Sequence, residues 1–134
     1  MRGRGGRRPL GRSGAAAGGL VLLLVAAPAP DGTGEDAEAQ SQLARGRALY
    51  VQHCFACHLP GSVGPELTRE VLAGMGTART LFNFIRTAMP QNAPGSLTDQ
   101  EYWDILAHML AETGLLPAGI RPEPETADTL RLAP

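Results

Sequence analysis

Apolar residues recur at steps of three and four along three stretches of this 134-residue chain, residues 40–58, 78–88 and 98–113. Steps of this size place apolar side chains on one face of an α-helix. No stretch shows the sustained alternation of apolar and polar residues that a half-buried strand requires. The hydrophobic pattern therefore predicts an all-α fold, with an N-terminal helix, a C-terminal helix and one or two helices between them.

Local signals mark the ends of these helices. Pro90 is expected to end the second helix, because it lacks a backbone N–H and cannot continue one. Thr98 and Glu101 have the spacing of a capping box, which predicts the start of the third helix, and Gly114 is a typical stop. Between the first two helices, residues 59–76 contain repeated glycines and prolines, which predict a loop that includes one helical turn.

The two ends of the chain differ from this middle part. Residues 1–30 begin with several arginines and no acidic residue and continue into a short apolar run, which is the order of an export signal peptide. A retained membrane anchor is the alternative, because the following prolines leave the cleavage site undefined, although the run is short for a membrane span. Residues 31–40 are expected to form an acidic linker, residues 41–114 the domain, and residues 115–134 a Pro-rich tail, either disordered or wrapped around a partner.

The charge of the chain depends on whether residues 1–30 are removed. All 12 basic residues are arginines, and 13 residues are acidic. After Pro30, seven arginines stand beside all 13 acidic residues, a formal charge of −6. An acidic domain without a basic stripe does not suit nucleic-acid binding. Aromatic residues make up only 4% of the chain, so a core this small is expected to need a covalent or cofactor staple.

The segment Cys54-Phe55-Ala56-Cys57-His58 carries the clearest chemical signal. It contains the only two cysteines of the chain, three residues apart, with an imidazole directly behind the second. This is the pattern of c-type haem attachment. At this spacing, Cys54 and Cys57 can each form a thioether with one vinyl group of a haem, and His58 can offer a ring nitrogen to the iron.

Three other uses of the cysteine pair stay open at this point: a structural disulfide, a thiol–disulfide oxidoreductase site, and half of a zinc site. Zinc would need further ligands such as His53 or His108, because the chain has no third cysteine. An oxidoreductase site would be expected beside a strand in βαβ units, and no such pattern surrounds Cys54.

An iron bound by His58 would have a second axial position to fill. Met89 is the first choice, since it follows the second helix, precedes the rigid Pro90, and lies far enough along the chain to reach the opposite haem face. A thioether favours Fe(II) over Fe(III) more than a second imidazole does, so Met89 would raise the reduction potential. Without a haem, Met89 would be an ordinary packing residue. The other candidates are Met75 as the fallback, His53, expected on the surface or behind the ligands, and His108, next to the packing stripe of the last helix.

Residues 40–114 resemble a class I monohaem cytochrome c. Besides the haem motif, Gly46-x-x-x-Tyr50 resembles the family's glycine and aromatic pair at the crossing of the two terminal helices. Gly64-Pro65 resembles the segment whose proline carbonyl, here that of Pro65, accepts the second N–H of the proximal histidine. Met89-Pro90 resembles the family's ligand loop.

Two finer features qualify this resemblance. His108 stands where the family usually has an aromatic residue in the C-terminal helix, so Tyr102 or Trp103 is expected to supply part of the crossing contact. Residues 89–114 are similar to small bacterial cytochromes c that are associated with quinoprotein dehydrogenases.

The resemblance implies a cytochrome c-like fold around one covalently bound haem c. The site residues are Cys54, Cys57, Pro65, His58 and Met89. It also implies a periplasmic electron carrier, not an enzyme, which takes single electrons from a dehydrogenase, including a quinoprotein one, and passes them to an oxidase or another cytochrome. Membrane contact is expected only if the N-terminal segment is retained. The alternatives are a haem enzyme or gas sensor with an open sixth position, and a thiol–disulfide oxidoreductase that uses the cysteine pair.

Overall fold

The computed structural model describes residues 33–133, and the export signal predicted for residues 1–30 lies outside them. The described residues form helices and no β-strand, which confirms the all-α prediction. One isolated β-bridge joins Thr77 and Arg131. The helices are α1 (Thr33–His53), α2 (Phe55–His58), α3 (Arg69–Ala73), α4 (Ala78–Ala88) and α5 (Asp99–Glu112). Within residues 33–133, no helix has the length and apolar character needed to cross a membrane.

Most helix boundaries follow the local signals of the sequence. α4 spans residues 78–88 as expected, and α5 begins after Thr98 in a complete capping box with Glu101. The helical turn expected in the glycine-rich loop is α3. α1 is the exception, because it begins at Thr33 rather than at Gln40, so that most of the stretch assigned to an acidic linker is helical.

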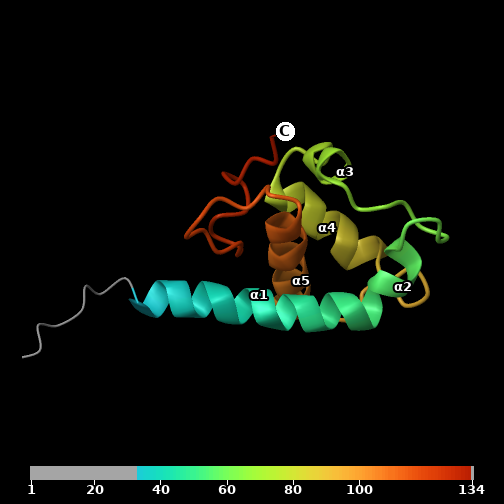
Figure 1. Ribbon diagram of the computed structural model, residues 1–134, viewed down its shortest axis with the longest axis horizontal. Coiled ribbons are helices and arrows are strands. Elements are labelled where there is room, and N and C mark those ends of the chain that lie inside the picture. The colour runs from blue at the N-terminus through green and yellow to red at the C-terminus, as the bar shows by residue number, and fades with distance from the viewer. Residues whose placement is uncertain (1–32, 134) are drawn as a thin grey trace, which may run out of the picture.

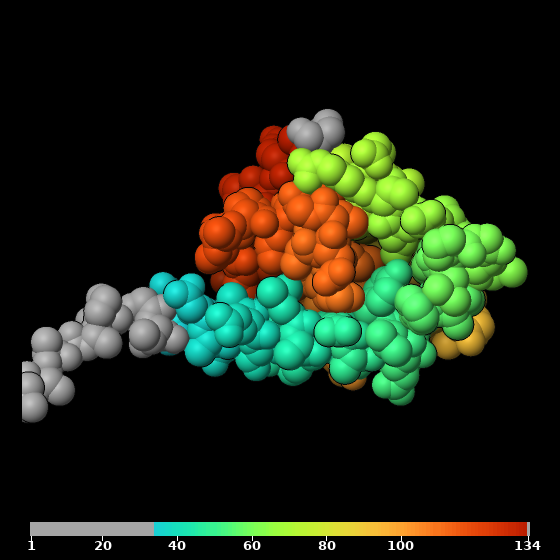
Figure 2. Space-filling view, viewed as in Figure 1, coloured from blue at the N-terminus to red at the C-terminus, as the bar shows by residue number. Residues whose placement is uncertain are grey.

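α1 forms one long edge of the molecule, and α5 runs across it (Figures 1 and 2). Gly46 permits this close crossing, since a Cβ atom added there would lie 1.8 Å from the backbone oxygen of Asp104. One helical turn later, the ring of Tyr50 contacts the ring of His108 edge-on, with 5.3 Å between the ring centroids. His108 therefore takes the aromatic residue's place in the crossing contact.

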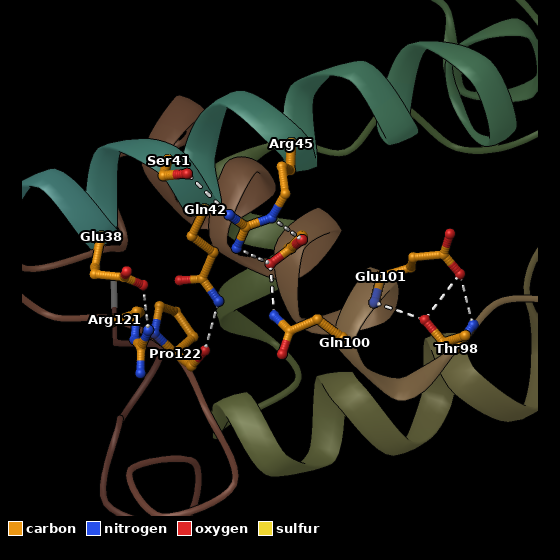
Figure 3. A network of polar contacts seen from close by, with 10 residues as sticks. Glu38, Ser41, Gln42, Arg45, Thr98, Gln100, Glu101, Arg121 and Pro122 are labelled. Atoms are coloured by element: carbon orange, nitrogen blue, oxygen red, sulfur yellow. Dashed lines mark hydrogen bonds and ion pairs between the residues drawn. The ribbon is translucent and has the colours of Figure 1, made fainter.

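A buried carboxylate stabilises the crossing of α1 and α5. Asp104 of α5 is only 2% exposed. Nε of Arg45 on α1 donates to one of its carboxylate oxygens at 2.7 Å, and the amide of Gln100 donates to the other at 2.8 Å (Figure 3). A charge is stable in such a place only when it is paired and hydrogen-bonded. Nearby, the Gln42 side chain donates to the backbone oxygen of Pro122 at 3.0 Å.

The core contains side chains of α4 and α5 together with Leu72 of α3 and residues of the C-terminal segment. The indole of Trp103 stacks on the ring of Phe82 with 3.9 Å between centroids and 8° between planes. Trp103 thus packs against α4 through Phe82, and the Tyr102 hydroxyl reaches the end of α4 at Met89. The other large buried side chains of the core include Leu72, Leu81, Ile85, Leu106 and Leu110.

Residues 115–133 have no regular helix, as expected, but they pack closely on the domain. Ala127 and Leu132 are buried. The backbone oxygens of Leu130 and Ala127 accept from the N–H groups of Ala78 and Arg79, each at 3.0 Å. These are N–H groups of the first turn of α4, which have no partner within their own helix. The segment therefore wraps its own domain beside α4 and α5 (Figure 1).

Candidate haem site

The cysteine pair lies on a single turn of chain at the end of α1. The backbone N–H of Cys54 donates to the oxygen of Tyr50 at 2.9 Å, and those of Cys57 and His58 both donate to the oxygen of Cys54 at 3.1 Å. This compact turn holds two thiols and one imidazole on neighbouring positions. Both cysteines are free, Cys54 partly buried and Cys57 exposed, so the structure contains no disulfide between them.

The electrostatic setting of Cys54 differs from that of a reactive thiol. Burial, with a smaller contribution from Cys57, raises the pKa of Cys54 to about 11. Nucleophilic thiols in oxidoreductases have lowered pKa values, because the thiolate is the attacking species. The first thiol of the pair is therefore poorly suited to thiol–disulfide exchange.

The imidazole of His58 has a fixed orientation. Its Nδ1 lies 2.7 Å from the backbone oxygen of Pro65. A carbonyl oxygen can only accept, so Nδ1 carries the proton and Nε2 is left free to bind a metal. Gly64 lets the chain pass this close, since a Cβ there would lie 2.7 Å from the backbone oxygen of Cys57 and 3.1 Å from the His58 ring.

A cavity of about 400 Å³ opens beside this turn. Its lining brings together Cys54, Cys57 and His58 with Met75 and Met89, from three separate parts of the chain. The remaining walls are mainly apolar and include Leu72, Leu81, Ile85, Leu97, Ile105 and Met109. Two free thiols, one oriented imidazole, two thioethers and apolar walls fit the donor set and the faces of a haem c.

The two other histidines occupy different places. His53 is half-buried and lines the cavity. His108 is absent from the lining and packs against Tyr50, so it belongs to the helix crossing. Among the described residues, no group of three or more histidine, cysteine or acidic side chains could hold a metal such as zinc.

Met89 is held by its backbone at the end of α4. Its N–H donates to the oxygen of Ile85 at 3.0 Å, and the peptide bond that joins it to Pro90 is cis. The hydroxyl of Tyr102 donates to the Met89 backbone oxygen at 2.7 Å. The sequence led us to expect Tyr102 or Trp103 at the helix crossing but gave no sign of this bond, because it joins residues from different elements.

The rim of the cavity is apolar and exposed. Val63 is 90% exposed, and Val71 and Phe84 are 44% and 47% exposed; all three line the opening. Glu66 and Glu70 are exposed in the same stretch of chain. Hydrogen bonds from its own backbone N–H and from Thr68 lower the pKa of Glu70, so this side chain is charged at neutral pH.

Comparisons with known proteins agree with this geometry. The sequence model of the family described as cytochrome c oxidase, cbb3-type, subunit III, matches residues 41–109. The thiosulfate dehydrogenase of Allochromatium vinosum is 34% identical over 80 residues, which covers 48% of this chain and 29% of that protein. The chain thus spans less than a third of that relative's length. No solved structure gives a significant match.

Proposed function

Because this chain belongs to the cytochrome c family, in the group described as cbb3-type cytochrome c oxidase subunit III, and so carries covalently bound haem c, we propose that it is an electron carrier with a fully ligated iron. Cys54 and Cys57 form the two thioethers, and His58 and Met89 are the axial ligands. Pro65 holds the proximal imidazole through its carbonyl oxygen. When bound, haem c supplies an iron that cycles between Fe(III) and Fe(II).

A single observation supports this assignment most strongly: Cys54, Cys57, His58 and Met89 all line one cavity, and the His58 ring has a fixed orientation. With both axial positions filled by side chains, the iron offers no place for a substrate. Rigid anchoring at both faces also limits the change in geometry between redox states. The chain's own residues therefore favour transfer of an electron over catalysis.

The donor and acceptor are proposed from weaker indications. Residues 89–114 are similar to cytochromes c associated with quinoprotein dehydrogenases, and the relative from Allochromatium vinosum is itself named a dehydrogenase. We therefore expect a dehydrogenase as donor, and an oxidase or another cytochrome as acceptor. Export by residues 1–30 would place this transfer in the periplasm.

The rim of the cavity suits brief docking of such partners. Val63 and Phe84 offer apolar surface at the opening, and Glu66 and Glu70 add negative charge nearby. A partner whose redox centre is surrounded by arginine or lysine would be steered to this surface at low ionic strength. Docking is therefore expected to weaken as salt concentration rises.

A haem enzyme is the second candidate, because the matched relative is named for a reaction on thiosulfate. It would require that Met89 leave the iron open to a substrate. The thiol–disulfide alternative is disfavoured by the raised pKa of Cys54.

Absorption spectroscopy of the exported protein tests the proposal. A His/Met electron carrier shows the sharp bands of a low-spin haem when reduced, the weak far-red band of thioether ligation when oxidised, and no rapid binding of CO. Its mass equals the polypeptide plus one haem. A high-spin spectrum with immediate CO binding would favour the haem enzyme instead, and a colourless protein would contradict both.

A further inference from the structure

Tyr102 stands out among the residues around the cavity, because it combines nearly complete burial with a polar group. The side chain is 1% exposed and lies in the first turn of α5. Tyr102 lines the cavity together with Ile105 and Met109, which share the same face of the helix. A buried phenol is costly unless its hydroxyl finds a partner. The partner it finds is the backbone oxygen of Met89, at 2.7 Å.

This bond completes the anchoring of Met89. The N–H of Met89 is held by Ile85, at the end of α4. Its carbonyl is held by Tyr102, from α5. Pro90, the next residue, has no N–H with which to continue the helix, and the chain turns away into the loop before Thr98. The two hydrogen bonds therefore attach the Met89 backbone to both helices that line this part of the cavity.

α5, which carries the Tyr102 side chain, is itself held in place at two points. Its N-terminus is closed by the capping box of Thr98 and Glu101. Two residues beyond Tyr102, the buried carboxylate of Asp104 is bound to Arg45 of α1 (Figure 3). The position of the Tyr102 ring, and of the carbonyl that it holds, is thus set by the packing of the whole domain.

We infer that Tyr102 is a positioning residue for the methionine ligand: its hydroxyl holds the Met89 backbone so that the thioether stays directed into the cavity. The inference rests on the proposed function in one respect, namely that Met89 binds the iron. A thioether is a weak ligand, so its occupancy depends on how little freedom the protein leaves it. Groups that hold metal ligands in place typically change metal affinity 10- to 100-fold when they are removed.

The test compares Tyr102→Phe with Tyr50→Phe in the holoprotein. Tyr102→Phe keeps the buried ring and removes only the hydroxyl. Tyr50→Phe is the matched control, because Tyr50 is a half-buried tyrosine of the helix crossing that packs through its ring against Phe55 and His108. The ferric proteins are titrated with imidazole, which has to displace Met89 in order to bind.

Tyr102→Phe is expected to bind imidazole about tenfold more tightly than the wild type, equivalent to about 1.4 kcal/mol. Its far-red thioether band should also disappear at a lower imidazole concentration. Tyr50→Phe should match the wild type in both measurements. Equal imidazole affinity in all three proteins would overturn the inference, even if Tyr102→Phe lowered the melting temperature, since that combination describes a residue that only packs.

If the Tyr102→Phe variant does not accumulate, the hydrogen bond can be tested on the wild type instead. The Tyr102 hydroxyl proton of the reduced protein should give a slowly exchanging NMR resonance close to the Met89 protons. A rapidly exchanging hydroxyl would refute the bond. If the wild-type ferric protein has no far-red band, or if Met89→Ala keeps it, Met89 ligation fails and the inference fails with it. If the band is present in the wild type and lost in Met89→Ala, an unaltered Tyr102→Phe variant overturns the inference alone.

Discussion

The crossing of α1 and α5 and the cavity beside α4 are built on different principles. At the crossing, backbone meets backbone at Gly46, and the polar groups of Arg45 and Asp104 satisfy one another. Around the cavity, the walls are apolar side chains, and two polar contacts dominate, at the Pro65 and Met89 carbonyls. The crossing is completed by the protein's own side chains, whereas the cavity is matched to haem c. Changes at the crossing should therefore act on stability, and changes at the cavity should act on the cofactor.

The largest effect is expected from substitutions that prevent attachment of the cofactor in the cavity. Replacing both Cys54 and Cys57 with alanine removes the two thiols proposed to form thioethers, so no protein with covalently bound haem should accumulate. Mass spectrometry would find bare polypeptide. Phe55→Ala, inside the same motif, leaves both thiols and His58 in place and should retain haem. Normal covalent haem in the double variant would refute the attachment site.

Met89→Ala is the next largest change, and it should alter the iron while leaving the haem attached. Loss of the thioether favours Fe(III), so the reduction potential should fall by on the order of 100 mV. The iron should also bind CO readily. Met75→Ala is the control, since Met75 lines the same cavity. If Met75→Ala gave these effects and Met89→Ala did not, the sixth ligand would be Met75.

Gly46→Ala tests the close crossing of α1 and α5. A Cβ there would overlap the Asp104 backbone oxygen, which cannot move without shifting α5. The free energy of unfolding should drop by about 2–3 kcal/mol, as measured by chemical denaturation. Gly34→Ala is matched to it, in the same helix with nothing within 4 Å of the added Cβ, and should be neutral or slightly stabilising. Similar destabilisation by both substitutions would mean that the helices do not cross at Gly46.

The smallest effect concerns His108 and pH. Burial lowers the pKa of His108 in the folded state, outweighing the nearby Glu112 carboxylate, while Arg47 lowers it further. Below the unfolded pKa of about 6.5, His108 is protonated more readily in the unfolded chain than in the folded protein. Protonation therefore favours the unfolded state, and the protein loses stability as the pH falls below this value.

The pH effect of His108 is isolated by His108→Phe, which keeps a ring against Tyr50 and cannot be protonated. Denaturation at pH values on both sides of the wild-type transition should show a shallower dependence in this variant. An identical pH dependence in the two proteins would assign the acid sensitivity to other groups.

Local features of the fold could be predicted from the sequence. The α4 boundaries, the capping box at Thr98 and the single turn that carries Cys54 and His58 all depend on residues within four positions of one another. Helical periodicity and capping are interactions of this range. The chemistry of the cysteine motif is equally local, which is why its haem could be proposed from five consecutive residues.

Features that depend on distant residues could not be predicted in the same way. Residues 115–133 were expected to form a tail from their composition, yet Leu130 and Leu132 are buried and the segment supplies hydrogen-bond acceptors to α4. His108 replaces an aromatic residue at the crossing because its ring can pack edge-on against Tyr50. The packing of the C-terminal segment has no signature in the neighbouring sequence. The resemblance marked the position of His108 but did not show that its own ring makes the contact with Tyr50.

By itself, the sequence determined where α4 lies, where α5 begins and which five-residue segment is proposed to attach the haem, because those properties arise from contacts along one turn of chain. Only the tertiary structure decided which side chains share the cavity, how Tyr102 reaches the Met89 carbonyl, and where the C-terminal segment lies. These depend on hydrogen bonds and packing between residues far apart in the chain, which exist only after α1 and α5 have crossed.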